Sequence, residues 1–196
     1  MNLSDETRQS RNDLLKGLLV QLDHHLPSER GHAERVAVYS VATGQRLGLD
    51  DDALLNLRYA ATLHDVGKIR VDRNLLTKIG KLDDTEIAAM RLHAAIAESV
   101  LESIDWLAPV LPDIRHHHER WDGEGYPDGL AGTEIPIGAR IISVAETFDV
   151  MVSGPYRERA LEEAAIDELR ECSGSQFDPE VVEAFIKVQP LIQPIS

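Results

Sequence analysis

The sequence predicts an all-α protein, a bundle of about seven to eight helices with one structured loop rich in Gly and Pro. Apolar residues recur every three or four positions over most of the 196 residues, and Gly or Pro follows many of these runs. Hydrophobic residues make up 43% and charged residues 28% of the chain, an ordinary globular mixture. The chain is therefore long enough and apolar enough to bury a core without disulfides.

The helices are placed by their apolar stripes and by the residues that bound them. Leucines from Leu14 to Leu22 predict a helix over residues 5–26, which Pro27 ends. Gly48 ends the next helix, and the acidic residues 50–52 suit the N-terminus of the third. The helices after the first are expected over residues 32–47, 51–64, 84–103, 106–118, 138–152, 158–170 and 179–188.

Two segments are expected to contain no long helix. Residues 66–82, with Gly67, Gly80 and several basic residues, are expected to form a loop or short turns, and residues 120–136, rich in Gly and Pro, a structured loop. Residues 1–26 are expected to form a separate packing or dimerisation helix, and residues 27–190 the main domain.

The charge balance excludes extended nucleic acid as a partner. Asp and Glu number 34 against 20 Lys and Arg, a net charge of −14, whereas nucleic-acid binding needs a basic surface. A small phosphate ligand would need a local positive charge, which bound metal ions supply. With one cysteine, no signal peptide and no membrane-spanning apolar run, a cytoplasmic location and no membrane partner are expected.

The histidines predict a metal centre. His64 and Asp65 stand at the end of a predicted helix, His32 and His93 on inward stripes of two others, and His117 before the second loop. Imidazole and carboxylate together suit Fe, Mn, Zn or Ni, and the absence of thiolates argues against a structural zinc finger. The two oxygens of one carboxylate can bridge two ions, which would clamp a phosphoryl displacement and activate a water.

Each residue also has an ordinary structural explanation. A lone His93 on a helix stripe would normally be a hydrogen-bonded core residue, and Glu146 could be a buried ion-pair partner. Successive helical residues diverge by about 100°, so His117 and His118 can face one ion only if the helix ends there. Asp149, one turn after Glu146, is expected to orient a ligand histidine.

Ordered motifs give the chain a resemblance to the HD-GYP domains of the bacterial HD phosphohydrolase superfamily. The resemblance spans about residues 27–188. The matching segments are residues 31–36 (GHAERV), 64–69 (HDVGKI), 117–130 (HHERWDGEGYPDGL), 135–136 (IP), 139–142 (ARII), 144–149 (VAETFD) and 176–179 (QFDP).

The resemblance implies a metal-dependent phosphodiesterase that hydrolyses cyclic di-GMP to linear pGpG, with cleavage on to GMP left open. It implies two divalent metal ions, iron (Fe) or manganese (Mn) before nickel (Ni), magnesium (Mg) or zinc (Zn), bridged by Asp65. Lys68, Tyr126 and Arg157 would contact the substrate, and Lys68 would act with Asp65 in catalysis. The implied metal ligands are His32, His64, Asp65, His93, His117, His118 and Glu146.

The chain departs from the family pattern at several places, three of which bear on the predicted site. Ser28 stands where some members carry a glutamate for a third metal, and Glu146 stands where most carry aspartate. Residues 154–157 (GPYR) lack one residue of the usual stretch, a substrate-facing arginine. The alternatives are therefore a hydrolase for another nucleotide, a cyclic-dinucleotide-binding module without turnover, and a scaffold that binds protein partners through its Gly-Tyr-Pro loop. A homodimer through residues 5–26 is also left open.

Overall fold

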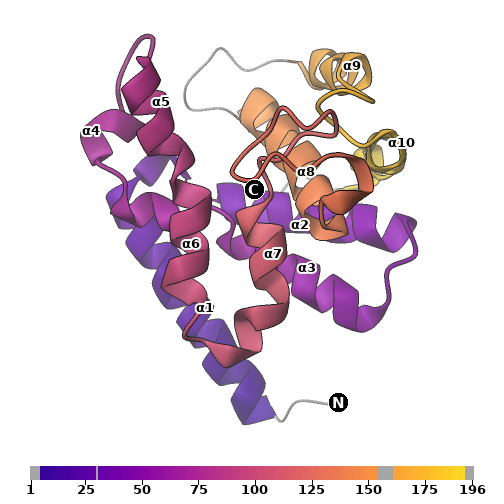
Figure 1. Ribbon diagram of the computed structural model, residues 1–196. Helices are drawn as coiled ribbons and strands as arrows, with labels where there is room; N and C mark the ends of the chain where they lie inside the picture. The colour runs from indigo at the N-terminus through magenta and orange to yellow at the C-terminus, as the bar shows by residue number, and fades with distance from the viewer. Residues whose placement is uncertain (1–4, 30, 154–160, 193–196) are drawn as a thin grey trace.

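The computed structural model describes residues 5–29, 31–153 and 161–192, and it confirms the all-α class (Figure 1). The α-helices are α1 (Asp5–His25), α2 (His32–Arg46), α3 (Asp51–Leu63), α4 (Arg73–Leu76), α5 (Asp84–Arg91), α6 (His93–Leu101), α7 (Leu111–Arg115), α8 (Ile137–Ser153), α9 (Glu162–Glu171) and α10 (Pro179–Val188). Short 3-10 helices are η1 (Pro27–Glu29), η2 (Val66–Arg70), η3 (Asp105–Val110), η4 (Gly132–Glu134) and η5 (Gln189–Leu191). Helices α4 and α7 have only 4 and 5 residues. Without them, eight α-helices remain in the described part of the chain, which agrees with the expected seven to eight.

Helix α2 lies at the centre of the bundle, where it packs against α3, α8 and α10 (Figure 1). Three aromatic rings join these helices: the Tyr39 ring lies 5.3 Å from Phe148 and 5.7 Å from Phe185, centroid to centroid. Phe148 and Phe185 are fully buried. This apolar contact fixes α8 against α2 and so sets the position of the side chains that both helices turn inward.

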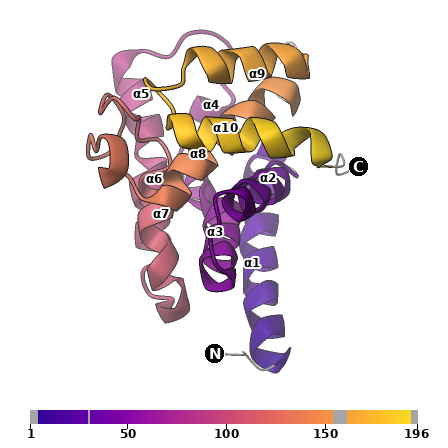
Figure 2. The ribbon, with the colours of Figure 1, turned by 90° about the vertical axis from the view of Figure 1, so that its right-hand side faces the viewer.

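Helix α1 packs on α3 and on η2 through buried leucines, including Leu15 and Leu22, and Figure 2 shows its N-terminal end extending beyond α3. Leu26 follows the helix and forms a small apolar cluster with Val71 and Leu76. Of the helices in the described part of the chain, none is both long and apolar enough to cross a membrane.

Two predicted helices are interrupted, so their predicted extents were wrong. The helix expected over residues 84–103 breaks at Leu92, where the Nδ1 atom of His93 bonds the Met90 carbonyl at 2.8 Å. The helix expected over residues 106–118 is a 3-10 helix followed by α7, which ends at Arg115. His93 follows the first break, and His117 and His118 follow the end of α7. The side chains of these three histidines lie close together.

Candidate metal centre

The seven predicted ligands converge in two groups although they are spread over five segments of the chain. The first group is His93, His117 and His118, and the second is His32, His64, Asp65 and Glu146. Within each group, one ligand atom per residue lies within 4.8 Å of the others. We call these the three-histidine group and the mixed group.

Asp65 lies between the two groups. Its Oδ1 atom is 3.4 Å from Nε2 of His93, in the three-histidine group. Its Oδ2 atom is 3.2 Å from Nε2 of His64 and 3.8 Å from Nε2 of His32, in the mixed group. Each carboxylate oxygen thus faces a different group, which is the arrangement of a bridging carboxylate.

Main-chain hydrogen bonds orient three of the histidines. The Nδ1 atoms of His64, His93 and His117 each bond the carbonyl three residues earlier, at 2.8, 2.8 and 2.6 Å. Such a bond places the ring proton on Nδ1 and leaves the Nε2 lone pair for a metal. The local backbone therefore sets the orientation of these three rings, with Nε2 on the side away from the carbonyl.

Asp149 orients the fourth histidine, as expected from its place one turn after Glu146. Its Oδ2 atom lies 2.8 Å from Nδ1 of His32, and Arg35 donates to both carboxylate oxygens at 2.6 and 2.9 Å. Burial opposes the charge on Asp149, but the hydrogen bonds from His32 and Arg35 hold its pKa below the usual value. A charged carboxylate behind His32 makes the imidazole a better ligand.

His117 and His118 can face one ion, because the preceding helix ends before them. Helix α7 ends at Arg115, so neither residue continues the helix, and their ring centroids lie 4.0 Å apart. Burial, together with the neighbouring imidazoles, lowers the pKa of both side chains well below the ordinary value. Both rings are therefore neutral and available for coordination.

The donor atoms fit divalent ions. Nε2 of His93 lies 3.1 Å from Nε2 of His118 and 3.5 Å from Nε2 of His117. Ligands about 2.1 Å from one ion are about 3.0 to 3.4 Å apart. Nε2 of His64 and Oδ1 of Asp65 are buried without a hydrogen-bond partner among the described residues. Burial disfavours charge on His64, but Asp65 raises its pKa to about 9, so an ion bound here replaces a proton.

Glu29, which no sequence motif singled out, is a buried carboxylate beside the mixed group. Its Oε2 atom lies 3.9 Å from Nε2 of His32, and its Oε1 atom accepts a 3.3 Å bond from Nζ of Lys68. Lys68 also donates to Oδ2 of Asp65 at 2.6 Å. A carboxylate thus stands three residues before His32, although the position four residues before it is Ser28. The short 3-10 helix η1 supplies it, and a search allowing a one-residue shift would have found it.

The Gly-Tyr-Pro loop covers one side of the centre. The Tyr126 ring stacks on the His118 ring at 4.8 Å with an interplanar angle of 25°. Glu119, also missed from sequence, is buried and its Oε1 atom accepts from the amides of Asp128 and Gly129 at 2.7 and 3.1 Å. This carboxylate holds the far side of the loop. Arg157, the remaining predicted substrate contact, lies outside the described residues.

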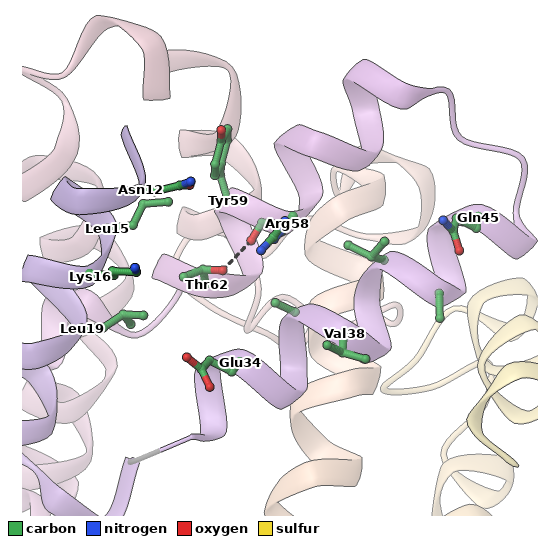
Figure 3. Close-up of a pocket in the computed structure, with 13 residues that line it drawn as sticks. Asn12, Leu15, Lys16, Leu19, Glu34, Val38, Gln45, Arg58, Tyr59 and Thr62 are labelled. Carbon is green, nitrogen blue, oxygen red and sulfur yellow. Dashed lines mark hydrogen bonds between the residues drawn. The ribbon is translucent and has the colours of Figure 1, made fainter. Parts of the chain in front are cut away.

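A groove of about 690 Å³ between α1, α2 and α3 is separate from this centre (Figure 3). Its lining includes Leu15 from α1, Val38 from α2 and Tyr59 from α3, and it contains none of the seven candidate ligands. The candidate functional site is therefore the cluster of histidines and carboxylates, and not this groove.

The fold and the site define a class: an all-helical domain with a buried histidine and aspartate cluster that can hold divalent metal. Residues 19–181 match the HD domain family, and the chain belongs to that family. This agrees with the resemblance drawn from the motifs.

Similar proteins agree with this assignment. The chain is 40% identical over 163 residues to a cyclic di-GMP phosphodiesterase of Thermotoga maritima, covering 81% of the chain and 44% of the relative. It is 37% identical over 172 residues to 3'3'-cGAMP-specific phosphodiesterase 3 of Vibrio cholerae, covering 87% and 37%. The chain thus spans less than half the length of these two relatives.

Two solved structures share the fold. The cyclic GMP-AMP specific phosphodiesterase of V. cholerae has a TM-score of 0.69 at 22% identity, covering 90% of this chain and 48% of that one. An HDGYP protein from Bdellovibrio bacteriovorus has a TM-score of 0.68 at 21% identity, covering 81% and 51%.

The Asp149→Asn variant is expected to bind metal about tenfold more weakly, because the neutral amide supports His32 less well than the carboxylate does. Chelator competition measures this affinity. Asp167→Asn, on the exposed surface of α9, is the control and should bind metal like the wild type. Equal affinities for both variants would show that Asp149 does not tune the centre.

Proposed function

We propose that this chain is a metal-dependent phosphodiesterase that hydrolyses cyclic dinucleotides, with cyclic di-GMP opened to linear pGpG and further cleavage to GMP left open. The position of Asp65, with one carboxylate oxygen toward each ligand group, carries the proposal. The names of the relatives supply the substrate class.

The seven ligands would hold two divalent ions, which would activate a water and stabilise charge on the phosphate. Asp65 would fix the separation of the two groups. Lys68, whose ammonium group lies beside Asp65, would offset negative charge on the attacked phosphate and so lower the barrier. Tyr126, stacked on His118, would close the site on the loop side, and Arg157 would contact the substrate phosphates.

Iron or manganese is the proposed metal, with nickel, zinc or magnesium as alternatives. Five imidazoles and two carboxylates offer nitrogen as well as oxygen donors, whereas magnesium prefers oxygen alone. Elemental analysis of protein purified without oxygen tests this choice directly.

The substrate is tested with a panel on one metal-loaded sample. Cyclic di-GMP, 3'3'-cGAMP and cyclic di-AMP are compared by chromatographic detection of the linear products. We expect the highest kcat/KM with cyclic di-GMP, and chelation should abolish it. Preference for 3'3'-cGAMP would correct the substrate, binding without cleavage would make the chain a binding module, and neither binding nor cleavage of any member would overturn the proposal.

A further inference from the structure

We infer that Arg91 is a further substrate-binding residue, which pairs with the second phosphate of a cyclic dinucleotide while the first is cleaved. This inference rests on the proposed function and names a recognition contact for it. Arg91 belongs to none of the sequence motifs and is exposed at the end of α5.

Arg91 is connected to the centre through Tyr126 of the Gly-Tyr-Pro loop. Its guanidinium carbon lies 5.0 Å from the centroid of the Tyr126 ring, over the ring. The Tyr126 ring in turn stacks on the His118 ring, whose Nε2 belongs to the three-histidine group. The break at Leu92 separates α5 from α6, so Arg91 and His93 approach the same loop from one short segment.

The guanidinium of Arg91 is available to an anion. Four other arginines are already paired with carboxylates: Arg35 with Asp149, Arg115 with Asp128 and Glu98, Arg120 with Asp122, and Arg140 with Asp178. Lys68 is held by Asp65 and Glu29. For Arg91, no carboxylate of the described residues lies within 4.0 Å, and a cation over an aromatic face keeps its N–H donors free at the edge.

The chemistry of the substrate supplies the partner. A cyclic dinucleotide carries two phosphodiester groups, each with one negative charge, and a single metal centre can attack only one at a time. The second phosphate remains anionic beside a protein of net charge −14, so it needs a local cation. A guanidinium matches two phosphate oxygens with a pair of N–H donors, which a lysine cannot do.

Arg91→Ala and Arg91→Lys test the contact with two probes. Cyclic di-GMP carries two phosphates, and bis(4-nitrophenyl) phosphate carries one. For Arg91→Ala we expect KM for cyclic di-GMP to rise about ten- to a hundredfold with kcat within about threefold, because a charge-assisted contact is lost. Hydrolysis of the one-phosphate probe and metal content should stay at the wild-type level, and Arg91→Lys should recover only part of the KM.

Arg73→Ala removes another exposed arginine, from α4, and should leave all these values unchanged. An equal loss on both probes would reduce Arg91 to a support for Tyr126, and an unchanged KM would remove it from the site; either result overturns the inference while the proposed function stands. If the wild-type protein neither cleaves nor binds cyclic dinucleotides, the proposed function fails first and the inference fails with it.

Discussion

The Asp65→Ala variant is expected to lose bound metal and more than about a thousandfold of its cyclic di-GMP turnover. Asp65 is the one candidate ligand whose two oxygens face both groups, so its removal opens both. Removal of Glu146, which belongs to the mixed group alone, should cost less. Elemental analysis and product chromatography on the same samples measure the two losses.

The fold of this variant must be checked because Asp65 is buried and paired. Its loss leaves the ammonium of Lys68 with Glu29 alone and removes the carboxylate beside His64. Asp65→Asn keeps the shape of the side chain and should fold, yet still lose metal. Helical circular dichroism and urea unfolding separate loss of structure from loss of metal. A folded Asp65→Asn protein with full metal content and turnover would refute the bridging role.

Sequence patterns placed the helices well where local signals are strong. Helix α10 begins at Pro179 and ends at Val188, as predicted, and Asp178 accepts from the amide of Glu180 at its N-terminus. The break at Leu92 has no comparable signal, since the surrounding residues favour helix. At the break, the His93 ring bonds the Met90 carbonyl. This bond orients His93 toward His117 and His118, which come from a distant segment of the chain.

The candidate site likewise combines features that local sequence signals predict and features that depend on packing between distant segments. Six of the seven candidate ligands stood in short motifs that could be recognised one by one, whereas His93 was placed by its position on a helix stripe. Their separation into two groups about Asp65 depends on how α2, α3, α6 and α8 pack, which spacing along the chain does not encode. Glu29 and Glu119 were missed because their roles come from backbone geometry: one lies in a 3-10 turn, and the other binds loop amides.

Gly67, in the motif after Asp65, shows how closely this packing is constrained. A Cβ atom at Gly67 would lie 2.0 Å from the carbonyl oxygen of His93 and 2.6 Å from the amide nitrogen of Ala97. These are backbone atoms of α6, which cannot yield as a flexible side chain would. We therefore expect Gly67→Ala to push η2 away from α6 and to lower the free energy of unfolding by about 2 to 4 kcal/mol.

The same displacement should separate the two ligand groups, because Asp65 precedes η2 and His93 begins α6, with 3.4 Å between their donor atoms. Metal content should fall together with stability. Gly17→Ala in α1 is the matched control: its Cβ would meet nothing within 4 Å, and alanine should raise helix stability by up to about 1 kcal/mol. Urea unfolding and elemental analysis compare the two. A Gly67→Ala protein as stable and as metal-rich as Gly17→Ala would mean that α6 and η2 can separate without cost, and that the centre does not depend on their contact.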